Sequence, residues 1–255
     1  MTQIVTLWIG DSIGPIERAC MRSMLHQGHD VALYCYREVA DVPDGVSLKD
    51  AEPILPRTSI PDSWSDRSDL YSDWFRYLIQ QRGLGTWLDL DVYLVAPLDM
   101  ERPYLFGEYA PGKINGAVLR LPPDAPILAP LLEQFRTGLR IRSLPVLTQP
   151  QTLYRKLRMG VSHLAKSPFG STGPFALTSL VPKYGLSSEA LPIDVFYPMH
   201  WRSASWIIDA SKRVEDVTTE RTVAVHLWNE IIRKYKHSPA PGGSFLERLQ
   251  KEGRP

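Results

Sequence analysis

The sequence predicts an α/β protein with a Rossmann-like, mostly parallel central sheet flanked by helices. The first segments of the chain carry this prediction. Residues 3–8 (QIVTLW) and 31–36 (VALYCY) are apolar and rich in β-branched and aromatic side chains, as strands are. Between them, residues 15–27 begin with Pro15 and stop before Gly28, as a helix does. A strand, a helix and a strand within about 35 residues are typical of a parallel crossover, and such sheets bind ligands beyond the carboxyl ends of their strands.

The composition indicates one folded unit and argues against a nucleic-acid partner. The chain has 255 residues, of which 44% are hydrophobic, so it can bury a large core, and we expect one merged domain over residues 1–255. A net charge of +1 lacks the basic excess that phosphate backbones require. Only Cys20 and Cys35 are present, which is too few for a disulfide scaffold. We therefore expect a reducing compartment.

No targeting or membrane segment is expected. The first residues, MTQIVTLWIG, contain neither a basic leader nor a long apolar run. No window approaches the ~20 apolar residues that a transmembrane helix needs. The sequence therefore predicts a cytoplasmic protein without a transmembrane segment.

The remaining elements follow from local patterns. Residues 37–69 are interrupted by prolines and are expected to be an irregular loop, either a functional covering or a mobile segment. Further strands are expected at 86–91, 92–99, 104–109, 114–121 and 223–228, and further helices at 72–82, at 126–140 with Asp124 as its cap, from Pro174, and in a short C-terminal tail.

The stretch from Ser72 to Asp91 joins a predicted helix, which stops at Gly83, to a predicted strand that carries two acids. Because side chains alternate along a strand, Asp89 and Asp91 should share one face. A carboxylate at the end of an apolar strand is costly unless a cation neutralises it, and a divalent ion such as Mn2+ or Mg2+ is the simplest solution. An Asp-X-Asp tripeptide by itself is also explained by two solvated acids at a strand end.

This block resembles the signature of a family of retaining glycosyltransferases. The family, thirty-second in the usual sequence classification, contains the α-1,4-galactosyltransferases and the yeast initiating α-1,6-mannosyltransferases. Its pattern reads Ser-Asp-x-x-Arg-Tyr, a hydrophobic turn, Gly-Gly, then aromatic-hydrophobic-Asp-hydrophobic-Asp. The chain departs at the double glycine, which reads Gly83-Leu84-Gly85. The matching residues are Ser72, Asp73, Arg76, Tyr77, Trp87, Leu88, Asp89, Leu90 and Asp91.

The resemblance implies a GT-A-like fold and a set of donor contacts. Trp8, Ile9 and Gly10 would place an indole against the nucleotide base, although a core tryptophan is the ordinary alternative. Asp73 and Arg76 would bind and orient the donor sugar or its diphosphate. Asn115 would contact the transferred sugar, or would be a turn residue without a ligand.

The resemblance also extends to the end of the chain. Residues 224–229 match an Ala-Val-His-hydrophobic-Trp-Asn segment of the family, which makes His226 the third metal ligand beside Asp89 and Asp91. Residues 194–201 (DVFYPMHW) resemble an aromatic segment that is either a sugar platform or a buried cluster. Lys234 and Lys236 are either solvated or close to a phosphate.

One basic region remains outside these motifs. A solvated face explains it better than attraction to an anionic or lipid-linked acceptor. Its members are Arg136, Arg140, Arg142, Arg155, Lys156 and Arg158.

The resemblance therefore implies a metal-dependent retaining hexosyltransferase in polysaccharide biosynthesis. Its donor would be a nucleotide diphosphate sugar, with UDP favoured over GDP, and its acceptor a saccharide or lipid-linked saccharide, the only link to a membrane. Residues 1–100 would form the nucleotide-sugar half, and residues 101–255 the acceptor half with a closing loop at 239–244.

Two other functions are consistent with the acids. Haloacid-dehalogenase-type phosphohydrolases also place Asp-X-Asp at a strand end, but they need Thr or Val where this chain has Tyr93. A non-catalytic nucleotide-sugar-binding protein would keep the same pocket.

Overall fold

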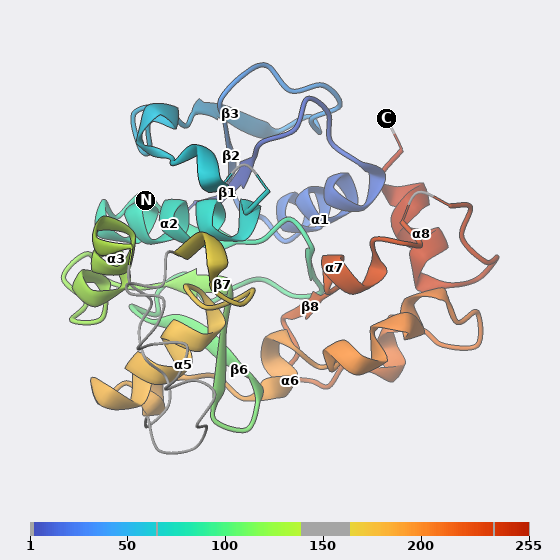
Figure 1. Cartoon of the computed structure of the whole chain (residues 1–255). Coiled ribbons are helices and arrows are strands. Elements are labelled where there is room, and N and C mark those ends of the chain that lie inside the picture. The colour runs from blue at the N-terminus through green and yellow to red at the C-terminus, as the bar shows by residue number, and fades with distance from the viewer. Residues whose placement is uncertain (1–2, 65, 139–163, 237, 255) are drawn as a thin grey trace.

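The computed structural model describes residues 3–64, 66–138, 164–236 and 238–254 (Figure 1). Its strands are β1 (Ile4–Trp8), β2 (Val31–Cys35), β3 (Val46–Asp50), β4 (Thr86–Leu88), β5 (Val92–Leu94), β6 (Leu105–Ala110), β7 (Lys113–Arg120) and β8 (Ala224–His226). Its α-helices are α1 (Pro15–His26), α2 (Ser68–Gln81), α3 (Leu128–Thr137), α5 (Pro174–Lys183), α6 (Ile193–Phe196), α7 (Asn229–Ile232) and α8 (Phe245–Glu252). Short 3-10 helices are η1 (Arg57–Ser59), η2 (Asp62–Trp64), η4 (Leu164–Lys166), η5 (Ser187–Glu189), η6 (Trp201–Ile208) and η7 (Val214–Asp216).

The central sheet has six strands in the order β3-β2-β1-β4-β7-β6. Strands β3, β2, β1 and β4 are parallel, and β7 and β6 continue the sheet as an antiparallel pair. The carboxyl ends of the four parallel strands therefore lie along one edge. This topology confirms the expected α/β class with a mostly parallel sheet.

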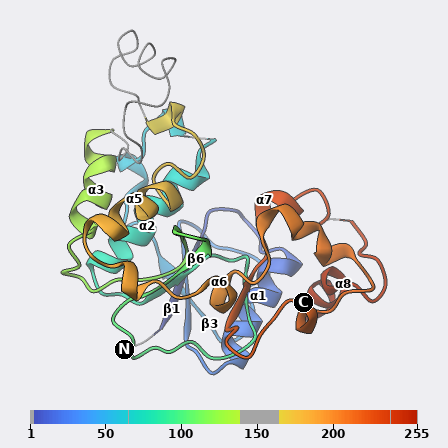
Figure 2. The same cartoon turned by 90° about the horizontal axis from the view of Figure 1, so that it is seen from below.

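Helices cover both faces of this sheet. On one face, Val5, Leu7 and Trp87 pack in a core cluster with Phe75 and Ile79 of α2, and α3 and α5 add to the same cluster. On the other face, Met24 of α1 packs with residues of β1, β2 and β4. Figures 1 and 2 both place α1 and α8 together on one side of the molecule, with α2 and α3 on the other.

Helix α2 ends where the sequence predicts. Its buried side chains include Leu70, Phe75 and Ile79, which form its apolar stripe. Gly83 adopts the left-handed conformation (φ +61°), and Leu84 N–H donates to the Ile79 carbonyl across it. A glycine tolerates this conformation at little cost, so the helix stops and the chain turns directly into β4.

Two expected elements differ in the structure. Strand β3 lies within residues 37–69, which were expected to be irregular because prolines interrupt them. It is a short, mostly exposed strand at the sheet edge, in which Val46 and Leu48 alternate with polar residues. Helix α3 begins only at Leu128 and has no side-chain cap. Asp124 is therefore not its cap; the residues before the helix form turns, in which Ala125 N–H donates to the Pro122 carbonyl.

The strand expected at residues 86–91 is also shorter. It ends at Leu88, after which Asp89 N–H donates to the Ala117 carbonyl and Val92 N–H donates to the Asp89 carbonyl. The two acids thus lie in a turn and not on the strand. Residues 92–94, expected to cross the main sheet, instead pair antiparallel with β8 in a separate two-stranded sheet.

Two further expectations concern a transmembrane segment and the basic region that includes Arg136. Among the described residues, no helix has both the length and the apolar character needed to cross a membrane. Arg136 is exposed and pairs with Glu133, as a solvated residue of α3 would. The other basic residues of that region (140, 142, 155, 156 and 158) lie outside the described residues.

Candidate metal centre

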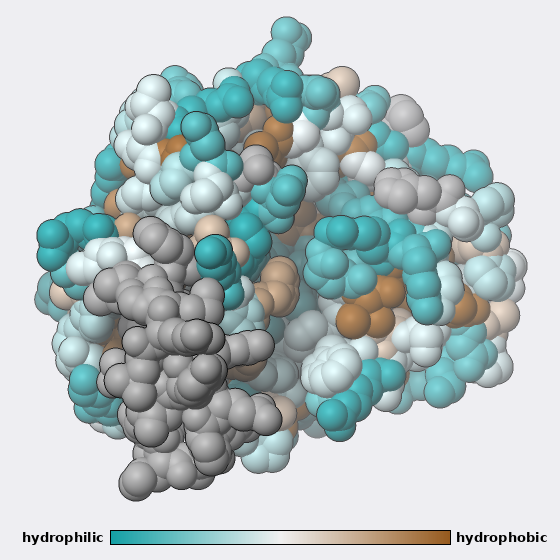
Figure 3. Space-filling model, in the orientation of Figure 1, coloured by the Kyte–Doolittle hydropathy of each residue, from teal (hydrophilic) through white to brown (hydrophobic). Residues whose placement is uncertain are grey.

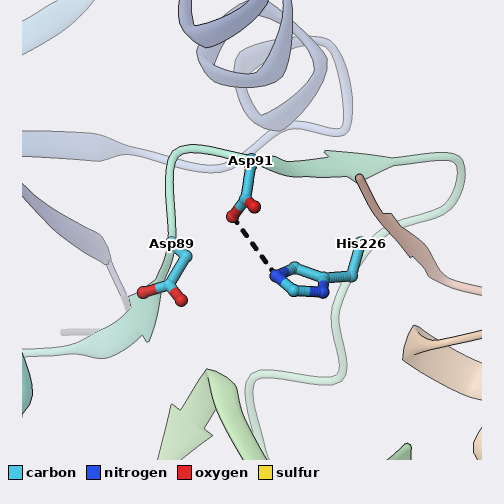
Figure 4. Close-up of side chains that lie close together, drawn as sticks. All are labelled: Asp89, Asp91 and His226. Carbon is cyan, nitrogen blue, oxygen red and sulfur yellow. Dashed lines mark ion pairs between the residues drawn. The ribbon is translucent and has the colours of Figure 1, made fainter. Parts of the chain in front are cut away.

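Asp89, Asp91 and His226 lie together beyond the carboxyl end of β4. One ligand atom from each residue can be chosen so that all three atoms lie within 4.8 Å of one another. Figure 4 shows the two acids on the turn after β4 and the imidazole reaching toward them from β8. The predicted ligands are therefore brought together by the fold.

The small sheet explains how residues so distant in sequence meet. Strand β5 follows the acidic turn directly, and Val92 pairs with His226 in the register of β5 with β8. Leu227 N–H also donates to the Asp91 carbonyl at 2.8 Å. The pairing thus fixes the backbone of the histidine beside the backbone of the second acid.

Asp91 is held from the C-terminal part of the chain. Its Oδ1 lies 3.3 Å from His226 Nε2, and its Oδ2 accepts a hydrogen bond from Asn229 N–H at 2.7 Å. Burial by itself would raise the pKa of Asp91, but the charge and hydrogen bond of His226 and the Asn229 N–H lower it to about 2. Asp91 is therefore ionised at neutral pH.

Asp89 is held from the N-terminal part of the chain. Its Oδ1 accepts a hydrogen bond from Trp87 Nε1 at 2.7 Å and lies 3.0 Å from Arg76 Nη2. Burial raises the pKa of Asp89, and Arg76 opposes this shift. Both contacts use Oδ1, which leaves Oδ2 as the oxygen that can take a metal.

Arg76 joins Asp89 to Asp73 inside the protein. Its Nε lies 3.4 Å from Asp73 Oδ1, and its Nη1 donates to the Gly116 carbonyl at 2.7 Å. Thr172 Oγ1 donates to Asp73 Oδ2 at 2.7 Å. Asp73 and Arg76 are only 4% and 5% exposed, so they form a buried pair and not a surface one. Burial raises the pKa of Asp73 to about 6, against the opposing effect of Arg76.

His226 sits in an aromatic box. Its ring centroid is 4.3 Å from that of Trp228 and 5.6 Å from that of Tyr197. Burial lowers the pKa of His226, but Asp91 raises it more, so the net shift is upward. Nε2 faces the acids, whereas Nδ1 is buried and has no hydrogen-bond partner in the described part of the chain. The imidazole is thus oriented by packing and by Asp91.

The donor set fits a hard divalent cation. Two carboxylates and one imidazole are ligands that Mn2+ and Mg2+ accept. Adjacent ligands of an octahedral ion with bonds of about 2.1 Å lie about 3 Å apart, close to the 3.3 Å between Asp91 Oδ1 and His226 Nε2. Asp91 and His226 are therefore spaced nearly as two neighbouring ligands of one ion would be.

The charged side chains around the site carry an excess of negative charge. Among the described residues, contacts connect four carboxylates (Asp73, Asp89, Asp91 and Glu17) to two permanently charged cations (Arg76 and Lys236). With His226 neutral, two negative charges remain uncompensated. A divalent cation would balance them.

The molecular surface is hollowed on the face that Figure 1 shows. In the space-filling view the hollow lies near the middle, between the side of α2 and β7 and the side of α7 and β8 (Figure 3). In this view it adjoins β8, the strand that carries His226.

Trp8, Ile9 and Gly10 lie at the carboxyl end of β1. The Trp8 side chain packs partly buried against a cluster that includes Leu90, the residue between the two acids. A Cβ on Gly10 would lie 2.8 Å from Trp8 Nε1, so a glycine here lets the indole fold over the backbone. Ile9 is exposed, and its carbonyl accepts from Arg37. Contact of these residues with a nucleotide stays a prediction.

Asn115 and the aromatic segment 194–201 relate to the ligands in different ways. Asn115 Oδ1 accepts from Ala117 N–H at 2.9 Å, and among the described residues no hydrogen bond joins the Asn115 side chain to Asp89 or Asp91. Phe196 and Tyr197 are almost fully buried, and Tyr197 packs on His226, as expected for a buried aromatic cluster. Trp201, at the end of the segment, is 37% exposed.

Some residues of the network could not be foreseen. Lys236 was expected to be solvated or close to a phosphate, but it is buried against Glu17 and Asn229. Thr172, which supports Asp73, precedes the recognised Gly173-Pro174 helix start but carries no signal of its own. No described contact joins the loop at 239–244 to the metal ligands; it leads into α8, which packs on α1.

The chain was compared with protein families, with curated proteins and with solved structures. No protein-family model matches the chain, and no curated protein matches it. Among solved structures the chain is similar to "PaToxG Glycosyltransferase", with 14% sequence identity and a TM-score of 0.43 over 74% of this chain and 72% of that one.

Proposed function

We propose that the chain is a metal-dependent glycosyltransferase. The observation that supports this most is the convergence of Asp89, Asp91 and His226 from two distant segments onto one point at the carboxyl edge of the sheet. Edges of this kind are where parallel α/β sheets bind nucleotides. A divalent cation held there supplies Lewis-acid stabilisation of a departing diphosphate.

Different residues of the chain would bind the metal, the nucleotide and the sugar. Asp89, Asp91 and His226 would hold Mn2+ or Mg2+. Trp8 would stack on the base of a nucleotide diphosphate sugar, with Ile9 and Gly10 lining the same end of β1. Asp73, Arg76 and Asn115 would orient the transferred hexose, Asp73 and Arg76 acting from inside the wall because both are buried.

The stereochemical part of the proposal is retention. Inverting transfer would need a carboxylate beside the acceptor as general base. Among the described residues, no carboxylate other than Asp73, Asp89, Asp91 and Glu17 is connected to the site by a hydrogen bond or an ion pair. Glu108, considered for that role, accepts a hydrogen bond from Gly112 N–H at 3.1 Å in the turn after β6. We therefore propose front-face transfer, in which a donor phosphate oxygen assists the incoming hydroxyl of a saccharide or lipid-linked saccharide acceptor.

The two halves of the chain would then have different partners. Residues 1–100 would hold the nucleotide sugar, with UDP preferred to GDP, and residues 101–255 the acceptor, with the loop at 239–244 closing the site. The reaction would take place in the cytoplasm, with contact to a membrane only through a lipid-linked acceptor.

The test is hydrolysis of nucleotide sugars in the absence of an acceptor. UDP- and GDP-sugars are screened with Mn2+ and with EDTA, and we expect release of free sugar that needs both Mn2+ and Asp91. Asp91→Asn is the site variant, and Asp209→Asn, which changes an exposed carboxylate bonded only to Ser211 by the described contacts, is the matched control. Unchanged hydrolysis by Asp91→Asn would remove the site assignment. Turnover of an aryl phosphate in place of any nucleotide sugar would point to a phosphohydrolase.

A further inference from the structure

A chain of buried polar contacts runs from Asp91 away from the metal centre. Asn229 N–H donates to Asp91 Oδ2 at 2.7 Å, and Asn229 Oδ1 in turn accepts from Lys236 Nζ at 2.8 Å. The same ammonium group contacts the Glu17 carboxylate on the first turn of α1. The second acid of the metal centre is thus connected to α1 through one asparagine and one lysine.

The Glu17–Lys236 pair lies in an unusual place for two charges. Glu17 is 4% exposed and Lys236 is 8% exposed. Desolvation offsets much of the attraction within such a pair, so stability alone is a weak reason for a fold to contain one. Glu17 Oε2 has, moreover, no hydrogen-bond partner among the described residues, and a Cβ on Gly14 would lie 2.5 Å from it. The position of Lys236 is therefore better explained by its hydrogen bond to Asn229 than by its ion pair with Glu17.

What Lys236 holds is the start of α7. Trp228, the residue before this helix, has a left-handed backbone (φ +59°), which is strained for a bulky side chain. Trp228 Nε1 donates to the Met199 carbonyl at 2.7 Å, and its ring packs on His226, so the preceding residues are fixed. A helix of four residues has little stability of its own. Lys236 supplies the second anchor by fixing the Asn229 side chain.

We propose that Lys236, held by Glu17, is a positioning residue for the metal centre. It fixes Asn229, whose N–H holds Oδ2 of Asp91, and so leaves Oδ1 turned toward Nε2 of His226. This inference rests on the proposed metal site. It assigns to Lys236 a role in preparing the ligands before any substrate binds.

The experiment measures Mn2+ affinity without substrate, by electron paramagnetic resonance, together with the urea unfolding of the metal-free protein. In Lys236→Met we expect Mn2+ affinity to fall by about tenfold or more, as for other groups that orient metal ligands. Lys251→Met is the matched control, because Lys251 also pairs with a glutamate (Glu247, 2.8 Å) but at the exposed surface of α8. Its Mn2+ affinity should equal that of the native chain.

A double variant separates positioning from stability. Lys236→Met leaves Glu17 as an unpaired buried charge and should destabilise the fold, whereas Glu17→Gln combined with Lys236→Met removes both charges and should recover much of that stability. Because Asn229 still lacks its anchor, Mn2+ affinity should remain low in the double variant. Native Mn2+ affinity in either variant would overturn the positioning role. Absence of Mn2+ binding by the native chain would instead overturn the metal site and this inference together.

Discussion

The two acids of the candidate metal centre are two residues apart, yet they belong to different networks. Asp89 is held by Trp87 and Arg76, within the first half of the chain, and burial raises its pKa. Asp91 is held by His226 and Asn229, from the last part of the chain, and its pKa is lowered to about 2. The turn between β4 and β5 is therefore the point at which the two parts of the fold share one site.

The two carboxylates are therefore not equivalent before a metal binds. The Asp91 charge is already stabilised by its partners, whereas the Asp89 charge is only partly compensated by an arginine that it shares with Asp73. A cation would therefore relieve Asp89 more than Asp91. The following changes test this contrast.

The largest effect is expected at Arg76. Arg76→Met removes the cation between Asp73 and Asp89 and leaves two buried carboxylates without it. Loss of one partner of a buried ion pair destabilises by about 3–5 kcal/mol, which urea unfolding at pH 7 in EDTA would measure. In Arg221→Met, where the same kind of side chain pairs with Asp194 at an exposed site, the change should stay within about 1 kcal/mol. Equal effects in the two variants would mean that the Arg76 network does not stabilise the fold.

Replacing the two acids should affect the free energy of unfolding differently. The lowered pKa of Asp91 means that its ionised form stabilises the metal-free fold; this contribution is present above pH 3.8 and is lost as the pH falls toward 2. Asp91→Asn should therefore lower the unfolding free energy at pH 7 by about 2 kcal/mol. Asp89→Asn removes a carboxylate whose pKa is raised, so it should leave the metal-free stability unchanged or higher.

Both substitutions should nevertheless weaken Mn2+ binding by more than about 100-fold, because each removes a ligand itself and not an outer group. Calorimetric titration with Mn2+ checks this. If Asp89→Asn destabilised the metal-free chain as much as Asp91→Asn does, the contrast between the two networks would be wrong.

Protonation of His226 gives a smaller effect. Asp91 raises the pKa of His226 above 6.5, so the protonated ring stabilises the metal-free fold at low pH, and this contribution is lost as the pH rises through the folded-state pKa. A metal needs the neutral imidazole. Mn2+ binding should thus release a proton near neutral pH, and affinity should fall by up to about tenfold per pH unit below that pKa.

Calorimetry in two buffers with different ionisation enthalpies counts the released protons. His226→Gln is the control, because any residual Mn2+ binding by this variant should release fewer protons than binding by the native chain. If Mn2+ binding by the native chain released no proton at pH 6.5, the metal would not be replacing a proton on the imidazole of His226.

Local patterns were sufficient for the elements that place the site. The apolar spacing of α2, its stop at Gly83 and the β1-α1-β2 crossover all depend on neighbouring residues, and each prediction is confirmed. Strand β3 was missed because the prolines of residues 37–69 outweighed a five-residue alternation, in which Val46 and Leu48 stand between polar residues at the exposed sheet edge. The end of β4 at Leu88 was missed because it depends on where β7 stops pairing, which the sequence of β4 does not contain.

In the site, too, neighbouring residues predict some contacts, whereas others depend on residues that are distant in sequence. Asp89 and Asp91 are only two residues apart in sequence, so their proximity could be predicted, but their different partners could not. His226 was identified only through the family resemblance, and the pairing of β5 with β8 places it. Lys236 was expected to be solvated or beside a phosphate because lysine is rarely buried, and its partner Glu17 lies 219 residues away.

The smallest effect is expected at Trp8, which concerns the donor and not the metal. Its ring is partly buried at the carboxyl end of β1, and a stacked base should gain about 1 kcal/mol from it. Trp8→Leu should therefore weaken UDP binding in the presence of Mn2+ by about fivefold, measured by calorimetry, and leave the affinity for Mn2+ alone unchanged. Trp201→Leu, at an exposed tryptophan of η6, should change neither. If Trp8→Leu bound UDP as the native chain does, the nucleotide would have to lie elsewhere than at the end of β1, and the first half of the chain would contribute to the site only through Asp73, Arg76 and the two acids.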